Sequence, residues 1–432
     1  MSKQMWSAPC IDQPIHGTVV VPGSKSISNR ALVLAAISRE PCTISNLLVA
    51  RDSALMIGAL GALGIGIDQL DRNSVRVTPH NLRGPAHIDC GLAGTLMRFL
   101  PPLAATADGD IEFDGDEGAR RRPMATTIES LRALGVAVSD AGSASLPFTV
   151  HGDGVVPGGS VELDASASSQ FVSGLLLSAP RFENGITVRH RGESVPSLPH
   201  IEMTVAMLQE AGAEVRSDVE DPTNARWTVR PGVINLGDFV VEPDLSNAAA
   251  FLGAAMVTAG SVTVPTWPTK TTQAGDQIRD VFAEMGGSCV LDDAGLTVTG
   301  PERMVGIDID LRDIGELTPT IAAVAVFAQT PSKLRGVAHL RGHETNRLAA
   351  LVTEINRLGG QAEELADGLT ITPQRLTGAS IATYHDHRMA TFGAIVGLRV
   401  PGTIVENIGT TAKTMPEFAQ MWTALVRGDG AA

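Results

Sequence analysis

A pattern of apolar helix, glycine and strand recurs about every 72 residues along this 432-residue chain. The glycine stands between an amphipathic stretch and a strand-like one, as in LRALGVAVS and LQEAGAEVR. A glycine there is typical of a helix C-terminus, where the backbone turns left-handed and a Cβ would clash. A repeat of this length constrains the architecture more than any local pattern does. The marker glycines are Gly64, Gly135, Gly212, Gly286 and Gly359.

Each repeat has the same order of segments, which predicts a β-α-β-α-β-β unit. A short strand leads, as GTVVVPGS in the first repeat and FVVEPD in the fourth, and a polar cluster and a small-residue apolar helix follow. A strand, an amphipathic helix and a hairpin complete the unit. The sixth copy stops near Leu425 without its hairpin, and the N-terminal WSAPCI could supply one missing strand.

The two helices of a repeat differ in polarity, and this predicts an α/β arrangement. The first is apolar on nearly all sides and is expected to be buried, whereas the second carries charges on one side and is expected to cover the sheets. A chain of 432 residues exceeds what one core usually serves, so two domains of three repeats are expected, with a boundary near 216–241. If the starts of several buried helices share a cleft, their unpaired N–H groups attract anions.

Composition excludes several classes of protein. The net charge of −14 disfavours nucleic acid and anionic membranes as partners, and an aromatic content of 4% disfavours base-stacking surfaces. The four cysteines show no C-x-x-C spacing, which argues against a zinc site or a disulfide framework. Neither a signal-peptide core nor a membrane-spanning run is present, so a cytoplasmic location is expected.

The polar clusters offer candidate anion ligands, each with a plainer alternative. In PGSKSISNR, Ser26 could cap a helix while Lys25 faces an anion, or Lys25 could simply be solvated. The serines of 166–170 could bind phosphate, although a helix cap is the commoner use. The charge run Asp114–Pro123 is more often a solvated face than an anion clamp.

Two histidine-containing segments superficially resemble metal sites. In HLRGHETNR, His339 and His343 are spaced i, i+4, but Arg341 and Arg347 flank them, so we expect no metal there. An anion site with one carboxylate for proton transfer suits this mixture better. In HDHRMA, Arg388 at a helix start likewise indicates a carboxylate or phosphate partner.

Taken together, the cations cluster at helix starts or in the loops that lead to them, in both halves of the chain. They predict a pair of small polyanionic substrates held between two domains, with carboxylates moving protons. No P-loop and no strand-linked G-x-G-x-x-G is present, so no sequence motif indicates a nucleotide as the ligand. The cations are Lys25, Arg30, Arg122, Arg347, Arg388 and Lys413, and the carboxylates are Glu316 and Glu344.

Six segments resemble the signatures of the 5-enolpyruvylshikimate-3-phosphate synthase family. They are PGSKSISNRAL, GLAGTLMRF, SASSQF, RGHETNRL, DHRMA and TAKTMPEF, and they follow in order from about residue 22 to residue 418. The resemblance implies the enolpyruvyl transferase fold, an inside-out α/β barrel in each of two domains of three repeats. The N-terminal domain would comprise 23–241 and bind mainly shikimate 3-phosphate. The C-terminal domain would comprise 1–22 and 242–432 and complete the phosphoenolpyruvate site.

The resemblance also implies a reaction, the transfer of the enolpyruvyl group of phosphoenolpyruvate to the 5-hydroxyl of shikimate 3-phosphate with release of phosphate. The protein would be a monomeric enzyme of aromatic amino-acid biosynthesis without an organic cofactor or a metal. Glu316 and Glu344 match acidic positions tied to proton transfer, and Lys25 could also donate a proton or only neutralise phosphate. Residues similar to the phosphoenolpyruvate site are Lys25, Gly94, Arg122, Gln170, Arg347, Arg388 and Lys413. Those on the shikimate 3-phosphate side are Lys25, Ser26, Arg30, Ser168, Ser169, Ser197, Glu316, His339 and His343.

Several positions depart from the commoner family pattern. Leu92 stands where many members carry Asn, and His343 where many carry Lys, so we expect activity with altered affinity and pH dependence. Gly94 is retained, and in the family a glycine there leaves room for the inhibitor glyphosate, so sensitivity is expected. The other departures are Phe99 for Pro, His200 for Tyr and Glu316 for Asp.

Three rival functions are considered. UDP-N-acetylglucosamine enolpyruvyl transferases often carry a cysteine in the loop equivalent to Asp114–Pro123, and this loop has none. RNA 3′-phosphate cyclases are disfavoured by the acidity of the chain and its few aromatic residues. A non-catalytic anion-binding paralogue is disfavoured because the cations and both carboxylates are all retained.

Overall fold

The computed structural model describes residues 5–429, which divide into two compact units. Unit 1 comprises the described residues up to Pro22 and from Glu242 onward, and unit 2 comprises Gly23–Val241. The chain therefore passes between the units twice, after Pro22 and after Val241. No helix within 5–429 has both the length and the apolar character needed to cross a membrane.

Unit 2 contains three four-stranded sheets in the orders β14-β3-β5-β4, β6-β7-β9-β8 and β10-β11-β13-β12. In each sheet the first two strands are parallel and the remaining neighbours are antiparallel. This pattern is the β-α-β-α-β-β unit that the sequence predicts. The strands are β3 (Cys42–Ser45), β4 (Gly66–Asp71), β5 (Ser74–Thr78), β6 (Ala86–Asp89), β7 (Asp108–Asp114), β8 (Ala137–Ser139), β9 (Phe148–Asp153), β10 (Gly159–Leu163), β11 (Ile186–His190), β12 (Val215–Asp218), β13 (Arg226–Val229) and β14 (Phe239–Val240).

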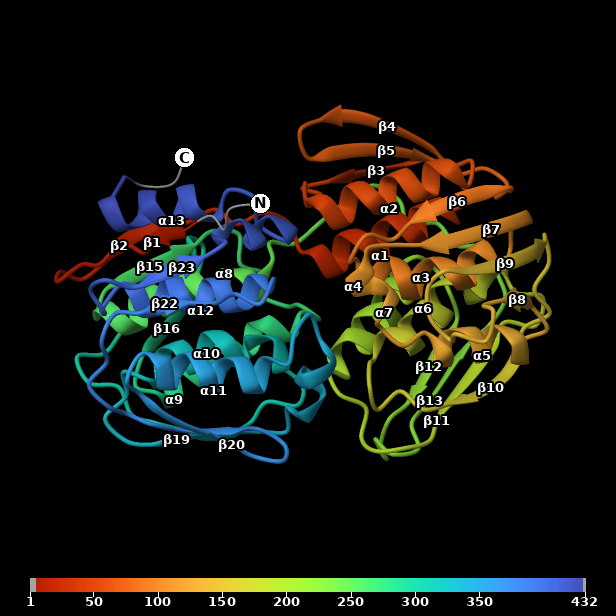
Figure 1. Cartoon of the computed structure of the whole chain (residues 1–432). Coiled ribbons are helices and arrows are strands. Elements are labelled where there is room, and N and C mark those ends of the chain that lie inside the picture. Colours follow the sequence, from red (N-terminus) through yellow and green to blue (C-terminus); the bar gives the residue numbers. More distant parts are fainter. Residues whose placement is uncertain (1–4, 430–432) are drawn as a thin grey trace. The chain divides into compact units, whose positions relative to one another are not determined.

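The helices of unit 2 fall into the two predicted kinds. The first helix of each repeat is almost wholly buried, and these three helices contact one another in the middle of the unit with the sheets around them (Figure 1). They are α1 (Lys25–Ala36), α3 (Gly94–Ala104) and α6 (Gln170–Ser178). The second helices leave one side exposed and are α2 (Arg51–Ala62), α5 (Ala125–Ala133) and α7 (Pro199–Glu210), and the short α4 (Glu117–Arg120) lies within the second repeat, between β7 and α5.

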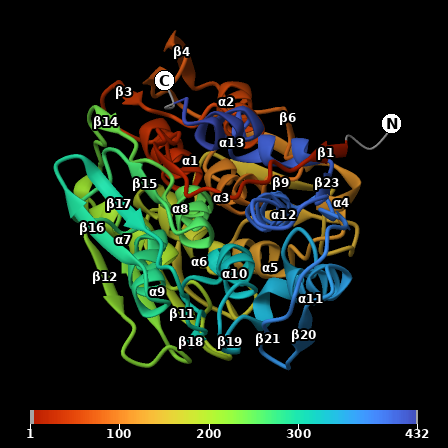
Figure 2. The same ribbon diagram turned by 90° about the vertical axis from the view of Figure 1, so that its left-hand side faces the viewer.

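Unit 1 repeats the scheme with sheets in the orders β16-β17-β15-β2, β18-β19-β21-β20 and β1-β23-β22. Its buried helices lie at the centre of the unit in Figure 2 and are α8 (Leu245–Thr258), α10 (Thr318–Ala325) and α12 (His387–Gly397). Its second helices are α9 (Ile278–Glu284), α11 (Arg347–Arg357) and α13 (Phe418–Arg427). The strands are β1 (Met5–Ser7), β2 (His16–Thr18), β15 (Ser261–Val264), β16 (Ser288–Asp292), β17 (Gly295–Thr299), β18 (Asp308–Asp310), β19 (Ser332–Arg335), β20 (Gln361–Glu364), β21 (Leu369–Thr372), β22 (Ser380–Ile381) and β23 (Ile404–Glu406).

The marker glycines have the backbone conformation that the repeat predicts. All five have φ between +82° (Gly359) and +99° (Gly286), where an L side chain is strained. The sixth repeat ends in the same way, because α13 stops at Gly428 with φ +74°. The prediction for the N-terminal segment is also confirmed, since β1 pairs with β23 and completes the sixth sheet.

The first and fourth repeats differ from the other repeats in the pairing of their leading strands. The strand that leads the first repeat in sequence, β2, pairs in parallel with β15 of the fourth repeat. The strand that leads the fourth repeat, β14, pairs in parallel with β3 of the first. The two repeats have exchanged their first strands. Both segments are short and apolar, so the sequence identifies them as strands without identifying their partners.

Candidate active site

The three buried helices of unit 2 begin at the same end of the unit, and hydrogen bonds tie their first turns together. Asn29 Nδ2 of α1 donates to Thr95 Oγ1 of α3 over 2.7 Å. Arg30 Nη2 of α1 donates to Ser173 Oγ of α6 over 3.3 Å. The helix starts therefore bring their partial positive charges to one place, as the anion-binding hypothesis requires.

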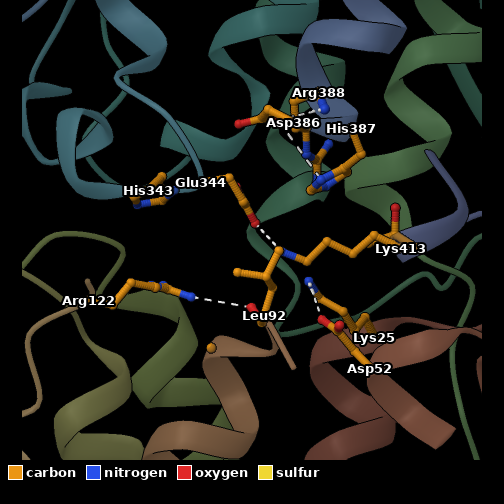
Figure 3. Close-up of polar contacts among 12 residues, drawn as sticks. Lys25, Asp52, Leu92, Arg122, His343, Glu344, Asp386, His387, Arg388 and Lys413 are labelled. Carbon is orange, nitrogen blue, oxygen red and sulfur yellow. Dashed lines mark hydrogen bonds and ion pairs between the residues drawn. The ribbon is translucent and has the colours of Figure 1, made fainter. Parts of the chain in front are cut away.

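Lys25 is the first residue of α1 and lies beside a buried carboxylate. Its Nζ is 3.7 Å from Asp52 Oδ2, and Asp52 is only 2% exposed (Figure 3). The cap of this helix was assigned to Ser26 and belongs instead to Ser24, whose Oγ accepts from the backbone N–H of Ile27. Ser24 is the residue just before the first helical turn, which is the usual capping position. Ser26 is thus left half-buried in the first turn, next to Lys25.

Arg30 is 2% exposed and is held by the protein itself. Its Nε donates to Thr204 Oγ1 over 2.7 Å and its Nη2 to the carbonyl of His200 over 2.9 Å. Its guanidinium also lies 5.0 Å from the centre of the Phe99 ring. These contacts give Arg30 a clear part in joining α1 to α7. They also anchor the backbone at His200, one of the positions that departs from the family pattern.

Gly94 opens α3 at a point of close approach. A Cβ at this position would lie 2.9 Å from Arg122 Nη1 and 3.2 Å from Gln170 Oε1. Arg122 Nη1 in turn donates to the carbonyl of Leu92 over 3.5 Å (Figure 3). Gln170 Oε1 is buried without a hydrogen-bond partner in the described structure. The predicted residues Gly94, Arg122 and Gln170 are therefore neighbours.

The charge run Asp114–Pro123 divides its arginines between two environments. Arg120 pairs with Asp114 at 2.6 Å and Arg121 with Glu117 at 2.5 Å, both on the exposed side of α4. Arg122 is half-buried and turns toward the start of α3. The interpretation of this run as a solvated face thus holds for Arg120 and Arg121. Arg122 is the arginine that the family resemblance predicts as a ligand.

The serines predicted for substrate lie at the starts of α6 and α7. Ser168 Oγ accepts from the backbone N–H of Gln170 over 3.2 Å, as a helix-capping serine does. Ser169 is 5% exposed. Ser197 precedes α7 with φ +52°, an uncommon conformation for a residue other than glycine.

In unit 1, Arg347 joins two carboxylates from different segments. Its Nε donates to Asp386 Oδ2 over 2.7 Å and its Nη2 to Glu344 Oε2 over 2.6 Å. Glu344 also accepts a hydrogen bond from Lys413 Nζ through its other oxygen (Figure 3). Burial lowers the pKa of Arg347, but Asp386 and Glu344 raise it above its ordinary value. The predicted residues Glu344, Arg347 and Lys413 thus form one network.

Asp386 is the centre of this network, and it was missed as a site residue. It is fully buried and caps α12 by accepting from the backbone N–H of Arg388 over 2.8 Å. An aspartate directly before an apolar helix is a recognisable capping signal. That signal was present in HDHRMA, although the distant partner Arg347 was not visible in it.

The buried helices of unit 1 also begin side by side. Arg388 Nη1 of α12 donates to the carbonyl of Ser246 in α8 over 2.7 Å. Ser246 Oγ donates to Glu316 Oε2, in the 3₁₀ turn that precedes α10, over 3.4 Å. Glu316 and Arg388 are therefore placed at adjoining helix starts, as predicted.

The two predicted histidines lie next to this cluster and are held neutral. Their ring centres are 5.6 Å apart. Burial lowers the pKa of His339 to about 4 and, with Arg347 next in importance, that of His343 to about 3. His343 Nδ1 faces Arg347 Nη1 at 3.2 Å. An uncharged His343 accepts a hydrogen bond from the arginine, whereas a lysine there would repel it.

One group of residues has the spacing of a metal site. Single ligand atoms of Glu344, Asp386 and His387 lie within 4.8 Å of one another. Arg347 already bridges the two carboxylates, so a cation would have to displace a buried guanidinium. The donor set therefore suits an internal ion-pair network better than a metal ion.

The fold is that of the enolpyruvyl transferases. Two solved structures of EPSP synthase from Acinetobacter baumannii match the chain with TM-scores of 0.83 and 0.81. Each match covers 98% of both chains at 23% sequence identity. The predicted fold class is thereby confirmed.

Sequence comparison identifies the family. A sequence model of EPSP synthase (3-phosphoshikimate 1-carboxyvinyltransferase) matches residues 10–422. A curated 3-phosphoshikimate 1-carboxyvinyltransferase from Kocuria rhizophila is 52% identical over 437 aligned residues, which cover 99% of this chain and 97% of that protein. The chain belongs to the EPSP synthase family.

Proposed function

We propose that the protein is a 3-phosphoshikimate 1-carboxyvinyltransferase. It transfers the enolpyruvyl group of phosphoenolpyruvate to the 5-hydroxyl of shikimate 3-phosphate and releases phosphate. The observation that carries this proposal is the 52% identity to a curated enzyme of that name along essentially the whole chain. The helix starts of both units support it, because they present cations that suit two anionic substrates.

We assign the phosphoenolpyruvate ligands to a glycine, an amide and cations that lie, within each unit, at helix starts or in the loops that lead to them. Arginine forks suit carboxylate and phosphate, and backbone N–H groups at a helix start add to their attraction. The proximity of Gly94, Arg122 and Gln170 supports assigning them together. The full set is Lys25, Gly94, Arg122, Gln170, Arg347, Arg388 and Lys413.

We assign shikimate 3-phosphate to the serines and to polar groups of both units. Ser168 and Ser169 at the start of α6 suit the phosphate, since hydroxyls and N–H groups there point the same way. Arg30 is buried among protein acceptors, so its contribution is to hold this region in place as well as to attract the anion. The full set is Lys25, Ser26, Arg30, Ser168, Ser169, Ser197, Glu316, His339 and His343.

The reaction needs three proton transfers, and two carboxylates stand in suitable surroundings. The oxygen of the attacking hydroxyl must lose a proton as it bonds to the enol carbon, and the methylene carbon must gain one. The elimination of phosphate then removes one proton from the methyl group. We assign these transfers to Glu316 and Glu344, with Lys25 as a further candidate donor. Glu344 is hydrogen-bonded to Lys413 and Arg347, so two cations hold its carboxylate in place.

Phosphate release is the direct test. The purified protein is incubated with phosphoenolpyruvate and shikimate 3-phosphate, and inorganic phosphate is measured against samples that lack either substrate. Release that depends on both substrates is the expected result. Release with UDP-N-acetylglucosamine in place of shikimate 3-phosphate would support the sister transferase, and no release with either acceptor would support a non-catalytic paralogue. A monomeric state and a cytoplasmic location remain predictions, testable by light scattering and by fractionation.

A further inference from the structure

Unit 2 contains a cavity of about 680 Å³ that the proposed function does not use. Cavities of this size commonly hold small organic ligands. The walls come from the loop between β5 and β6, from the turns that follow α2, α3 and β9, and from the 3₁₀ turn after α6. The lining residues that matter here are His80, Asn81, Arg83, Asp108 and Arg181.

The cavity lies at the opposite end of the buried helices from the candidate active site. Gly94 opens α3, whereas Thr106, in the cavity wall, lies just past its other end. Gln170 opens α6, and Arg181 follows the last turn of that helix. The 11 residues of α3 span about 16 Å, so a ligand in the cavity cannot touch the residues at the helix starts.

Two arginines in the cavity have no carboxylate partner. Within residues 5–429, neither Arg83 nor Arg181 forms an ion pair, not even with Asp108 in the same wall. Other exposed arginines do pair in this way, as Arg335 does with Asp308 at 2.5 Å. The chain has 47 acidic residues for 33 basic ones, so available carboxylates are not scarce.

Arg181 is also partly withdrawn from water. It remains accessible, but the surrounding walls crowd it enough to lower its pKa. An arginine stays charged in proteins, and Arg181 is exposed enough for an incoming anion to reach its charge. An anion in the cavity would restore the favourable interactions that the charge has lost.

The walls are fixed by backbone hydrogen bonds, so the cavity does not need to form around its ligand. The N–H of Arg83 donates to the carbonyl of Leu63 over 3.1 Å, and the N–H of Asp108 to that of Leu82 over 3.2 Å. The N–H of Gly154 donates to the carbonyl of Ala107 over 2.9 Å. Largely preformed walls are typical of small-molecule sites.

We propose that this cavity is a second anion site, which binds a small metabolite through a phosphate or carboxylate group held by Arg83 and Arg181. Asn81 and His80 offer further hydrogen bonds, and Asp108 accepts from a hydroxyl or ammonium group elsewhere on the same ligand. The ligand class is therefore a small hydroxylated or amino-bearing metabolite with at least one oxyanion group. The site is independent of the proposed transferase reaction.

The test compares phosphate binding by two charge-matched double variants. Arg83→Gln/Arg181→Gln removes both cavity charges, and Arg76→Gln/Arg226→Gln removes two exposed arginines of unit 2 outside the cavity. Equilibrium dialysis with radiolabelled inorganic phosphate measures binding to the full chain. Thermal unfolding and turnover check that both variants are folded. If the glutamine pair fails to fold, Arg83→Lys/Arg181→Lys keeps the charge but loses the arginine forks.

We expect the cavity variant to bind about one phosphate per chain fewer than the wild type, while the outside variant matches the wild type. The lysine pair should bind phosphate at least tenfold more weakly than the wild type. Succinate that displaces this phosphate would identify a carboxylate ligand, and displacement only by glycerol 3-phosphate would identify a phosphorylated one. Equal phosphate binding by the cavity and outside variants, or undiminished binding by the lysine pair, would overturn the proposal. Phosphate at the candidate active site is common to all the proteins, so loss of transferase activity does not affect the comparison.

Discussion

Two buried arginines, one in each unit, have opposite surroundings. Arg347 at the start of α11 is 2% exposed and is bonded to the carboxylates of Asp386 and Glu344. Arg98 in α3 is 3% exposed, and no carboxylate within residues 5–429 pairs with it. Its donors reach the carbonyls of Gly94 and Pro123, at 3.5 and 3.4 Å, and the sulfur of Met97 at 3.6 Å, and its Nε has no partner.

The pKa values express the same difference. The pKa of Arg347 is raised by its carboxylates despite burial, whereas burial, followed by the charge of Arg122, lowers that of Arg98 well below its ordinary value. Unit 1 thus neutralises its buried cation internally. Unit 2 keeps a buried positive charge close to Gly94 and Arg122, where an arriving anion can offset it. The two units thus treat a buried arginine differently, with an internal ion-pair network in unit 1 and an unpaired charge in unit 2.

Removing each arginine should therefore have very different consequences for stability. Arg347→Met leaves Asp386 buried without its partner, and we expect it to lower the free energy of unfolding by about 3–5 kcal/mol. Arg98→Met replaces an unpaired buried charge by an apolar chain, and we expect a change within about 1 kcal/mol. Urea denaturation of the two variants measures both values. Equal destabilisation by the two substitutions would contradict the contrast drawn here.

Lys25 tests the attraction that unit 2 provides. Lys25→Met should lower kcat/KM by about a thousandfold, because a cation that stabilises charge on the departing phosphate is lost. Lys25 also lies 3.7 Å from the buried carboxylate of Asp52, so thermal unfolding is measured to separate loss of the site from loss of the fold. The matched control is Lys333→Met on the exposed face of β19, which should keep full activity. Wild-type turnover by the Lys25 variant would remove this residue from the site.

Much of the fold could be predicted from the sequence because local residue patterns mark the helices of each repeat and the points where they end. The marker glycines require positive φ, and the unbroken apolar helices can only be buried, so both features are encoded locally. The exchange of β2 and β14 could not be predicted in this way. It depends on pairing between segments about 195 and 245 residues apart, which no local pattern specifies.

In the candidate site too, some features are encoded locally in the sequence and others depend on contacts between distant segments. Ser24, and not Ser26, caps α1, because the cap position depends on where the helix begins, and sequence patterns locate helix ends poorly. Asp386 was overlooked because its partner Arg347 lies 39 residues away in the chain. Cations at helix starts could be named individually, whereas their carboxylate partners became visible only in three dimensions.

Gly94 tests whether space beside Arg122 matters as much as charge. Gly94→Ala places a Cβ 2.9 Å from Arg122 Nη1, so the guanidinium must move. We expect KM for phosphoenolpyruvate to rise about tenfold and inhibition by glyphosate, which the family resemblance predicts for the wild type, to weaken at least as much. Gly58→Ala in α2 is the control, because its Cβ would meet nothing within 4 Å. An unchanged KM would show that Arg122 needs no such space.

The smallest expected effect concerns the neutral histidines beside the network of unit 1. In the folded protein the pKa of His339 is about 4 and that of His343 about 3, both below the ordinary value of 6.5. Between pH 6.5 and pH 4 the unfolded chain therefore takes up protons that the folded protein does not, so stability falls as the pH falls. The slope is up to about 1.4 kcal/mol per pH unit for each histidine.

Removing the titrating groups should flatten this dependence. His339→Gln and His343→Asn each keep a hydrogen-bond acceptor, and each should reduce the loss of unfolding free energy between pH 7 and pH 5.5 by about 1 kcal/mol. The exposed His16→Gln variant should behave as the wild type does. Urea titrations at the two pH values give the comparison. If neither substitution changes the pH dependence of the unfolding free energy, these histidines are already charged at pH 5.5. Arg347 would then lie beside a second cation. Its contact with His343 Nδ1 at 3.2 Å argues against this, because a charged imidazole offers no acceptor.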